Sequence, residues 1–583
     1  MLQIFTDNQP TDLTDDISID LVFENPLFNT ERIPATYSLS FDLPLTPRNR
    51  QLFGNPDRIA AAGNRFRERL ARILFAGSDL DAGVLTVEEV SDVLTVNFSG
   101  SVLSDYINRK MYNAPLGEIE LSYYTSGNDS TAIAQTDYDG RLRECLRDPN
   151  APYVACPLAV KDSGEAAERD PNNPQDQYLT TRKSFVNLTD KSGEGYLHYL
   201  TGGGGYLLKI LPAVKVWYLF DRIFGDKLDR NVFQEGEWTK LCLQTLWHSE
   251  YKLTDNLPPW RSEMRDGVNK KIIRWADFMP DVTVADFVVE LLKLPGCTMF
   301  IRGDHFSVEY NDDILNREVY RDLQLEDGYT ISREPGQKYV LGYSNTGDNE
   351  QADVELREAP SVVEGLKYMD GEKRVTAFRS QRPPQVLQAD SEEVPHLTVV
   401  KAYRAAEEPE ESDEEDEAST YDMAIQAEAV QCNVRRWWYE DADLESSTLE
   451  RFYIPEIESK RPDTILLGLF QGMQRHIRYS GVGFLYSYLS GTNYNAYGER
   501  LGDLSPDIDT LSGLTQRHTA FKAWIEKDKV VVTGNTLFTA RDLAELDLRD
   551  KFVFRGRRFF IRSMNVSLKK NAIDPAEVEL VEV

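Results

Sequence analysis

Histidine and cysteine, the side chains that most often bind metals or act as nucleophiles, are few and scattered in this 583-residue chain. No histidine belongs to an H-E-x-x-H motif or to a pair at helical spacing, and no cysteine belongs to a C-x-x-C pair. We therefore expect no metal site and reduced thiols, although Cys145 and Cys156 could close one loop. The residues are His198, His248, His305, His396, His476 and His518, and Cys145, Cys156, Cys242, Cys297 and Cys432.

The sequence evidence for catalytic residues is equally weak. Cys297 and His305 are close in sequence, but the thiol lies on an expected strand and not at a helix N-terminus, which would lower its pKa. No G-x-S-x-G motif occurs. The glycine run at 202–205 lacks the Lys-Ser/Thr of a phosphate-binding loop and is better explained as a hinge. The sequence predicts no catalytic, cofactor-binding or metal-binding residues and therefore no enzyme; paired carboxylates for glycoside hydrolysis cannot be judged by spacing in sequence.

The aromatic triplet Trp437, Trp438 and Tyr439 could form a sugar platform or a base-stacking site. Large adjacent rings are more often part of a core or a subunit interface, because they bury the most area per residue. We therefore expect these three rings to lie in a hydrophobic core or in a subunit interface.

The chain is acidic, with 65 basic and 96 acidic side chains and a formal charge of −31. Nine of the eleven residues from Glu407 to Glu417 are acidic, so we expect a disordered loop over 406–418, which lacks the ligand spacing of a calcium loop. The rest of the chain is also acidic, which argues against non-specific binding of nucleic acid. No apolar run is long enough to span a membrane, and the first 25 residues contain no secretory signal.

The N-terminal part of the chain shows the period-two alternation of half-buried strands, at 17–23 and again at 37–43. Apolar residues at spacings of three and four predict a helix over 55–77 that ends at Gly77. Further strands are expected over 84–98 and 119–123. One β-rich unit with one packed helix should therefore fill residues 1–130.

Two helix-plus-hairpin modules are expected farther along the chain. The first has a capping-box start at Thr283, an end at Gly296 and a hairpin over 297–310. The second begins at Thr539 and contains a hairpin that turns at 555–557. A mostly buried helix over 207–224 precedes the first module.

These patterns predict an α+β, β-rich chain of several domains. The expected units are 1–130, a β-rich unit with one helix; 131–205, a loop-rich insertion; 206–345, an α+β unit; 346–430, a β segment with the acidic loop 406–418; and 431–583, a β-rich C-terminal unit.

Several segments resemble tail structural proteins from phages and prophages of the Bacteroides-like lineage, in particular the tail-tip or baseplate hub. The first three are a strand, a proline-bracketed turn and the residues that follow it, and the others are spread over most of the chain. The segments are 33–41 (IPATYSLSF), 43–47 (LPLTP), 53–59 (FGNPDRI), 74–77 (LFAG), 82–85 (AGVL), 211–224, 282–310 and 552–578.

The resemblance implies a structural virion protein. It implies tail-tube-like β-barrel or sandwich domains with packed helices, assembled as a ring, usually a homotrimer, whose sheets join between chains around a channel. The implied ring closes the distal end of the tail tube and contacts the tube protein, the distal tail protein and spike or fibre proteins. It would be assembled in the host cytoplasm and carried on the virion, and genomic DNA would pass through it without sequence-specific binding.

Other functions remain open from the sequence. The hub could also hydrolyse cell wall, although no segment resembles a lytic domain. The chain could instead be a distal tail ring or fibre adaptor, or an unrelated carbohydrate-binding protein. Because the acidic channel wall would repel phosphates, we also expect part of the negative charge to face the channel.

Overall fold

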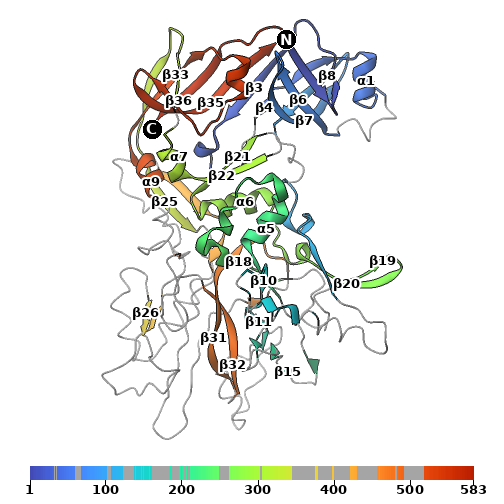
Figure 1. Cartoon of the computed structure of the whole chain (residues 1–583), viewed down its shortest axis with the longest axis vertical. Coiled ribbons are helices and arrows are strands. Elements are labelled where there is room, and N and C mark those ends of the chain that lie inside the picture. Colours follow the sequence, from blue (N-terminus) through green and yellow to red (C-terminus); the bar gives the residue numbers. More distant parts are fainter. Residues whose placement is uncertain are drawn as a thin grey trace.

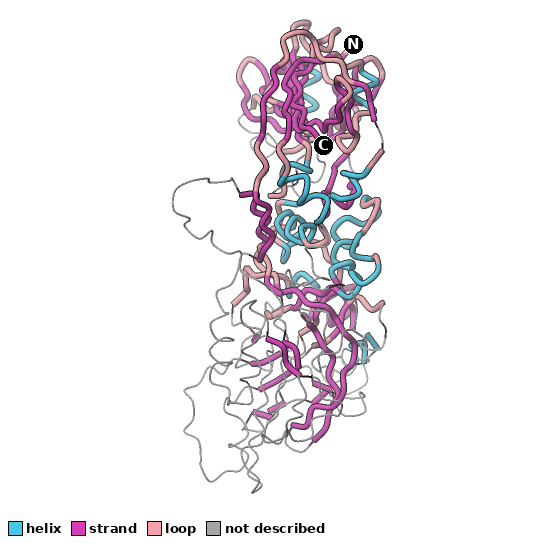
Figure 2. Tube along the Cα trace, turned by 90° about the vertical axis from the view of Figure 1, so that its left-hand side faces the viewer, coloured by secondary structure: helices cyan, strands magenta, loops and turns pink. Residues whose placement is uncertain are grey.

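The computed structural model describes residues 1–31, 36–58, 67–100, 107–121, 211–247, 261–302, 305–318, 320–343, 420–429, 460–479, 482–490 and 518–583, with isolated residues and short backbone segments between them. Along the long axis, an upper layer of strands holds the N-terminus, with the C-terminus at its lower edge (Figure 1). A band of helices follows, and below it lies the hairpin of β31 (Leu466–Tyr479) and β32 (Val482–Ser490) (Figures 1 and 2).

A 14-stranded sheet forms the upper layer. Its main path runs β2-β1-β6-β7-β8-β4-β3-β35-β36-β33-β24, with β5 paired to β8, β34 to β35, and β23 to β34. The strands are β1 Leu2–Thr6, β2 Gln9–Pro10, β3 Ser18–Glu24, β4 Tyr37–Ser38, β5 Phe41–Pro44, β6 Arg69–Phe75, β7 Ser78–Val90, β8 Val93–Ser99, β23 Tyr320–Asp322, β24 Thr330–Glu334, β33 Lys529–Thr536, β34 Lys551–Phe554, β35 Arg557–Lys569 and β36 Ala576–Glu582.

The two ends of the chain share one core in this sheet. Alternate residues of β3 and β35 point inward, so that Ile19, Leu21, Val566 and Leu568 are all fully buried in one hydrophobic cluster. The sheet stabilises the two ends together, because β3 pairs with β35 along its whole length, from Ser18↔Lys569 to Glu24↔Ser563.

The middle layer is a second, aromatic-rich core built around short helices. Trp275, Phe287 and Phe233 are fully buried there, and ring pairs such as Phe220 with Phe233 lie 4.7 Å apart. The helices are α5 Val216–Phe224, α6 Val284–Lys293, α7 Asn311–Asn316 and α9 Thr519–Glu526, and the upper layer adds α1 Pro47–Leu52 and α10 Ala540–Ala544.

Smaller sheets complete the middle and lower parts. They contain β9 Glu118–Leu121, β10 Tyr153–Val154, β11 Leu158–Val160, β12 Ser184–Val186, β13 Leu188–Thr189, β14 Tyr196–Leu197, β15 Leu200–Thr201, β16 Gly205–Tyr206, β17 Ala213–Lys215, β18 Leu241–Gln244, β19 Arg261–Arg265, β20 Val268–Arg274, β21 Cys297–Arg302, β22 His305–Tyr310, β25 Lys338–Tyr343, β26 Val375–Phe378, β27 Leu397–Val399, β28 Thr420–Ile425, β29 Glu428–Ala429 and β30 Glu456–Ile457. The expected α+β, β-rich class is confirmed. Within the described residues no sheet closes into a barrel, and ring assembly stays a prediction.

The helix expected over 55–77 is wrong where the structure describes it. Residues 69–75 form β6, which pairs with β1 and β7, and residues 59–66 lie outside the described residues. Ala71, Ile73 and Phe75 point inward at every second position. The segment therefore follows the alternation of a strand and not the three- and four-residue spacing of a helix. Gly77 does not end a helix but completes a two-residue turn, with φ 52° at Ala76 and 87° at Gly77. The helix of this unit is α1, which begins after Thr46.

The helix expected over 207–224 begins later, at Val216. The three residues before it form β17, and all three are buried between β10 and β18. Pairing on both sides therefore holds this segment extended. The strand over 37–43 is likewise interrupted after Ser38, so that Leu39 is exposed while Phe41 and Leu43 are buried.

Both helix-plus-hairpin modules are confirmed. Thr283 and Thr539 each cap a helix through a capping box, for α6 and α10 respectively. The hairpins are β21–β22 and β34–β35, and residues 303 and 304 in the first turn lie outside the described residues.

The expected domain boundaries stay predictions, but strand pairing crosses them. β9 lies inside the expected 1–130 unit and pairs with β20 of the middle layer. The sheet of the first unit continues into β35 near the C-terminus. Most of the expected insertion 131–205 lies outside the described residues, as do most of 346–430 and the whole acidic loop 406–418.

Candidate functional site

The described histidines and cysteines form no catalytic or metal-binding cluster. No group of three or more His, Cys, Asp or Glu side chains that could hold a metal occurs in this part of the chain. Cys297 and His305 lie at opposite ends of the β21–β22 hairpin, because Cys297 is paired with Tyr310 and His305 with Arg302. They cannot act as a thiol and its base.

The described cysteines form no disulfide, and burial makes two of their thiols poorly suited to nucleophilic chemistry. Cys145, Cys156, Cys242 and Cys297 are unbridged, so no disulfide joins Cys145 to Cys156. Burial raises the pKa of the Cys145 thiol to about 11 and also raises the pKa of Cys242. Both remain protonated at neutral pH, whereas the thiolate is the reactive form.

His518 makes defined side-chain contacts in the hydrophobic core of the middle layer, where it serves packing. The Tyr339 hydroxyl lies 2.8 Å from His518 Nδ1, and His518 Nε2 faces the Leu294 carbonyl oxygen at 3.4 Å. The carbonyl oxygen can only accept, so His518 Nε2 carries a proton, and the Tyr339 hydroxyl also donates to Met423 Sδ at 3.1 Å. Burial lowers the pKa of His518 to about 4. Sequence reasoning missed this pair because its members lie 179 residues apart.

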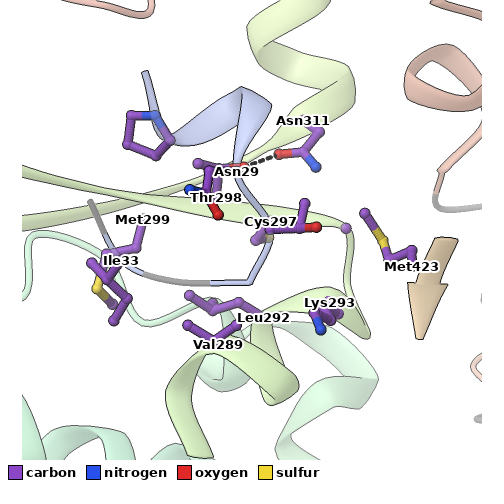
Figure 3. Close-up of a pocket in the computed structure, with 13 residues that line it drawn as sticks. Asn29, Ile33, Val289, Leu292, Lys293, Cys297, Thr298, Met299, Asn311 and Met423 are labelled. Atoms are coloured by element: carbon purple, nitrogen blue, oxygen red, sulfur yellow. Dashed lines mark hydrogen bonds between the residues drawn. The ribbon is translucent and has the colours of Figure 1, made fainter. Parts of the chain in front are cut away.

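A small cavity lies between α6, the start of β21 and the segment after β3 (Figure 3). Its volume is about 30 Å³, enough for one or two waters and far below the several hundred Å³ of ligand pockets. The polar groups around it already have partners: the Thr298 hydroxyl lies 2.6 Å from Asn311 Oδ1, and Lys293 Nζ donates to Glu290 at 2.9 Å. The cavity is a packing defect and offers no substrate site.

The remaining sequence candidates cannot be placed. The aromatic triplet 437–439, the glycines 202–204 and Cys432 lie outside the described residues, as do His198, His248 and His396. Within the described residues, no helix is long and apolar enough to cross a membrane.

The feature of the structure that most directly bears on function is a repeated unit in the upper sheet. The first unit contains β5, α1, β6, β7 and β8, and the second contains β33, α10, β34, β35 and β36. Each unit has the same order along the chain: strand, helix, strand, long strand, strand. Each also has the same order in the sheet, β6-β7-β8-β5 and β34-β35-β36-β33, with every pair antiparallel.

Local details agree between the two units. A threonine, Thr46 or Thr539, caps each helix by accepting a backbone N–H three residues later at 3.2 Å. A two-residue turn ending in glycine precedes each long strand, and its non-glycine residues, Ala76 and Arg555, have φ near 50°. Both long strands are 13 residues and both final strands are seven residues. We call residues 41–99 the first unit and residues 529–582 the second unit.

The two units meet at a seam made by β3 and β35. Asn25 closes one end of this seam with a buried side chain that donates to the carbonyl oxygens of Leu548 and Ile561, both at 2.9 Å. Its Oδ1 accepts from Leu27 N at 3.0 Å. In the middle of the seam, the Ser567 hydroxyl donates to the carboxylate of Asp20. Backbone pairing and polar side chains thus join the two units edge to edge.

Sequence reasoning did not find this repeat. The signals were present, because Thr-Pro at 46–47 and Thr-Ala at 539–540 mark helix starts, and Ala-Gly and Arg-Gly mark the turns. The Ala-Gly dipeptide also fits the end of a helix, and the apolar spacing before it favours that interpretation.

Comparison with known proteins adds the following. No family model matches the chain, and no curated protein matches it. Among solved structures, the chain is similar to the prophage MuSo2 43 kDa tail protein from Shewanella oneidensis, with 7% identity, 100% of this chain and 98% of that chain covered, and a TM-score of 0.29. It is also similar to the tail protein from Neisseria meningitidis MC58, with 10% identity, 100% and 96% covered, and a TM-score of 0.25. Neither TM-score reaches 0.5, so this likeness carries no functional conclusion.

Proposed function

We propose that this protein is a structural subunit of a phage tail that forms the tail-tip or baseplate hub as a ring of three chains. The observation that supports this proposal best is the repeated unit of the upper sheet. Three chains would place six similar units around one axis, so that the repeat within the chain would extend around the ring.

The open edges of the sheet also favour assembly. Among the strands that the structure describes, the path of the 14-stranded sheet ends at β2 on one side and at β24 on the other. Exposed edges promote uncontrolled association unless they are covered or paired, and closing a ring pairs them in a defined way.

The proposed ring closes the distal end of the tail tube and contacts the tube protein, the distal tail protein and spike or fibre proteins. DNA passes through its centre during infection. An acidic channel wall suits this passage, since carboxylates repel phosphates and no counterions are released by binding. The formal charge of −31 supplies the necessary carboxylates.

Copy number on the particle tests this proposal. We expect three chains per virion at the tail tip, measured by quantitative mass spectrometry against the tube protein and by gold labelling in electron micrographs. Six copies in a ring above the tip would indicate a distal tail ring, and absence from purified particles would overturn the proposal. A clear zone on a cell-wall zymogram would show that the hub is also a hydrolase.

A further inference from the structure

We propose that Asp547 is the centre of a conformational switch, in which Arg317 replaces Arg549 as its partner and thereby loosens the hairpin β21–β22 from the upper sheet. The switch lies where this hairpin and α7 meet the lower side of the upper layer (Figure 1). This inference goes beyond the proposed function and holds whether or not a ring forms.

Arg549 ties the second unit to the hairpin. It belongs to the segment between α10 and β34, and its Nη1 atom donates to the Ser307 hydroxyl at 2.9 Å and to Glu309 at 2.6 Å, both on β22. The guanidinium also lies 5.5 Å from the ring centre of Phe300 on β21. Because a charged donor holds two acceptors on one strand, this contact fixes the hairpin against the upper sheet.

Asp547 holds the Arg549 side chain in this position. The Asp547 carboxylate accepts four hydrogen bonds from Arg549, which come from the backbone N–H at 3.0 Å, from Nε at 2.8 and 3.1 Å, and from Nη2 at 2.8 Å. A carboxylate offers about four lone-pair positions, so Arg549 fills them all. Burial alone would raise the pKa of Asp547, but the hydrogen bonds from Arg549 outweigh it and lower the pKa, so the carboxylate stays ionised at neutral pH.

Arg317, which directly follows α7, is a second partner within reach of the same carboxylate. Its Nη1 atom lies 3.7 Å from Asp547 Oδ2 and 3.8 Å from Asp550 Oδ1, close enough for ion pairs but too far for hydrogen bonds. This atom is buried and has no hydrogen-bond partner among the described residues, which costs free energy. A shift of roughly 1 Å would bring Nη1 within hydrogen-bond range of Asp547. The two arginines therefore compete for one carboxylate.

This competition defines two arrangements of the same side chains. In the observed arrangement, Asp547 binds Arg549, and Arg317 Nη1 lacks a hydrogen bond. In the exchanged arrangement, Asp547 binds Arg317, and Arg549 loses the carboxylate that orients it toward β22. The exchange satisfies a buried donor and gives up the fixed contact with the hairpin, so a partner that pulls on the hairpin favours it.

The same segment reaches the seam between the two units. Leu548 lies between Asp547 and Arg549, and its carbonyl oxygen accepts a hydrogen bond from the Asn25 side chain at 2.9 Å. Asn25 closes one end of the β3–β35 seam through this bond and its bond to Ile561 O. The switch therefore acts on a segment that is bonded to both the hairpin and the seam.

Hydrogen exchange of the Arg549 backbone amide in the full chain reports the change of partner, because this amide donates to Asp547 in the observed arrangement. Arg317→Met removes the competing arginine, so the amide should exchange more slowly. Arg549→Met leaves Asp547 to Arg317, so the amide at position 549 should exchange about tenfold faster, after correction for the intrinsic rate of the new side chain. Arg541→Met is the matched control on the exposed side of α10 and should leave exchange at 549 unchanged.

A double-mutant cycle tests the link to the hairpin. Glu309→Gln removes the charge on β22 that holds Arg549 and leaves Asp547 untouched, so exchange at the Arg549 amide should become faster. In the Arg317→Met background the same substitution should have a smaller effect, because no second arginine can take the carboxylate. Glu309 is partly exposed and glutamine has the same shape, so this variant should keep the fold.

A fixed cluster would give different results. If Arg317 only stabilises Asp547, Arg317→Met should speed exchange at the Arg549 amide, and Glu309→Gln should have equal effects in both backgrounds. Either result, or unchanged exchange in Arg317→Met, would overturn the switch. The proposed ring would then still stand, because none of these measurements depends on assembly.

Discussion

Replacing Asn25 with alanine should separate the two units of the upper sheet. The buried side chain makes three hydrogen bonds, to Leu548 O, Ile561 O and Leu27 N. Each net hydrogen bond is worth about 1 kcal/mol, and groups left unpaired in a buried site add to the loss. Asn25→Ala should therefore cost about 3 kcal/mol of the free energy that keeps the seam closed.

Hydrogen exchange followed by mass spectrometry measures this loss locally. A cost of about 3 kcal/mol corresponds to roughly hundredfold faster exchange, because each 1.4 kcal/mol is a factor of ten. Peptides that cover 18–24 and 563–569 should lose protection together, since the two strands form one ladder. Asn565→Ala is the matched control on the same ladder, where an exposed side chain predicts a change within about 0.5 kcal/mol. Unchanged exchange, or faster exchange in only one of the two peptides, would refute the reasoning.

Three further predictions concern stability. Burial lowers the pKa of His518 from 6.5 to about 4, so between these pH values the unfolded state binds one more proton than the folded state. Acidification from pH 7 to 4 should therefore lower the free energy of unfolding by about 3 kcal/mol. His518→Gln should flatten the pH dependence of the urea midpoint. Thr46→Ala and Thr539→Ala should each lower the unfolding free energy by about 1 kcal/mol, since both threonines cap equivalent helices; clearly unequal losses in thermal melts would argue against the equivalence of the two units. Arg461 stacks between Tyr112 and Trp247 at 4.2 and 4.0 Å, so Arg461→Ala should cost about 2 kcal/mol in urea denaturation, while the exposed Arg541→Ala should cost almost nothing.

Local signals predicted much of the fold. The capping box at Thr283, the glycine after α6 and the alternation over 297–310 were all read from neighbouring residues. The segment 69–75 shows where such signals fail. Leu70, Ile73 and Leu74 fit a helix, while Ala71, Ile73 and Phe75 fit a strand, and pairing with β1 and β7 decides between them.

Long-range pairing could not be predicted from one sequence. Asp20 and Ser567 lie 547 residues apart, and no periodicity links them. The modules at Thr539 and Thr283 look alike in sequence, because both have a capping box and a hairpin. In the structure, the hairpin after Thr283 forms a separate two-stranded sheet. The counterpart of the Thr539 module is instead the first unit, because its strands have the same order in the upper sheet.

The mass of the purified full-length chain in native mass spectrometry tests the ring of repeated units most directly. We predict a complex of three chains, close to three times the 66.5 kDa of one chain. A particle that keeps the mass of a single chain at every concentration measured would contradict the ring.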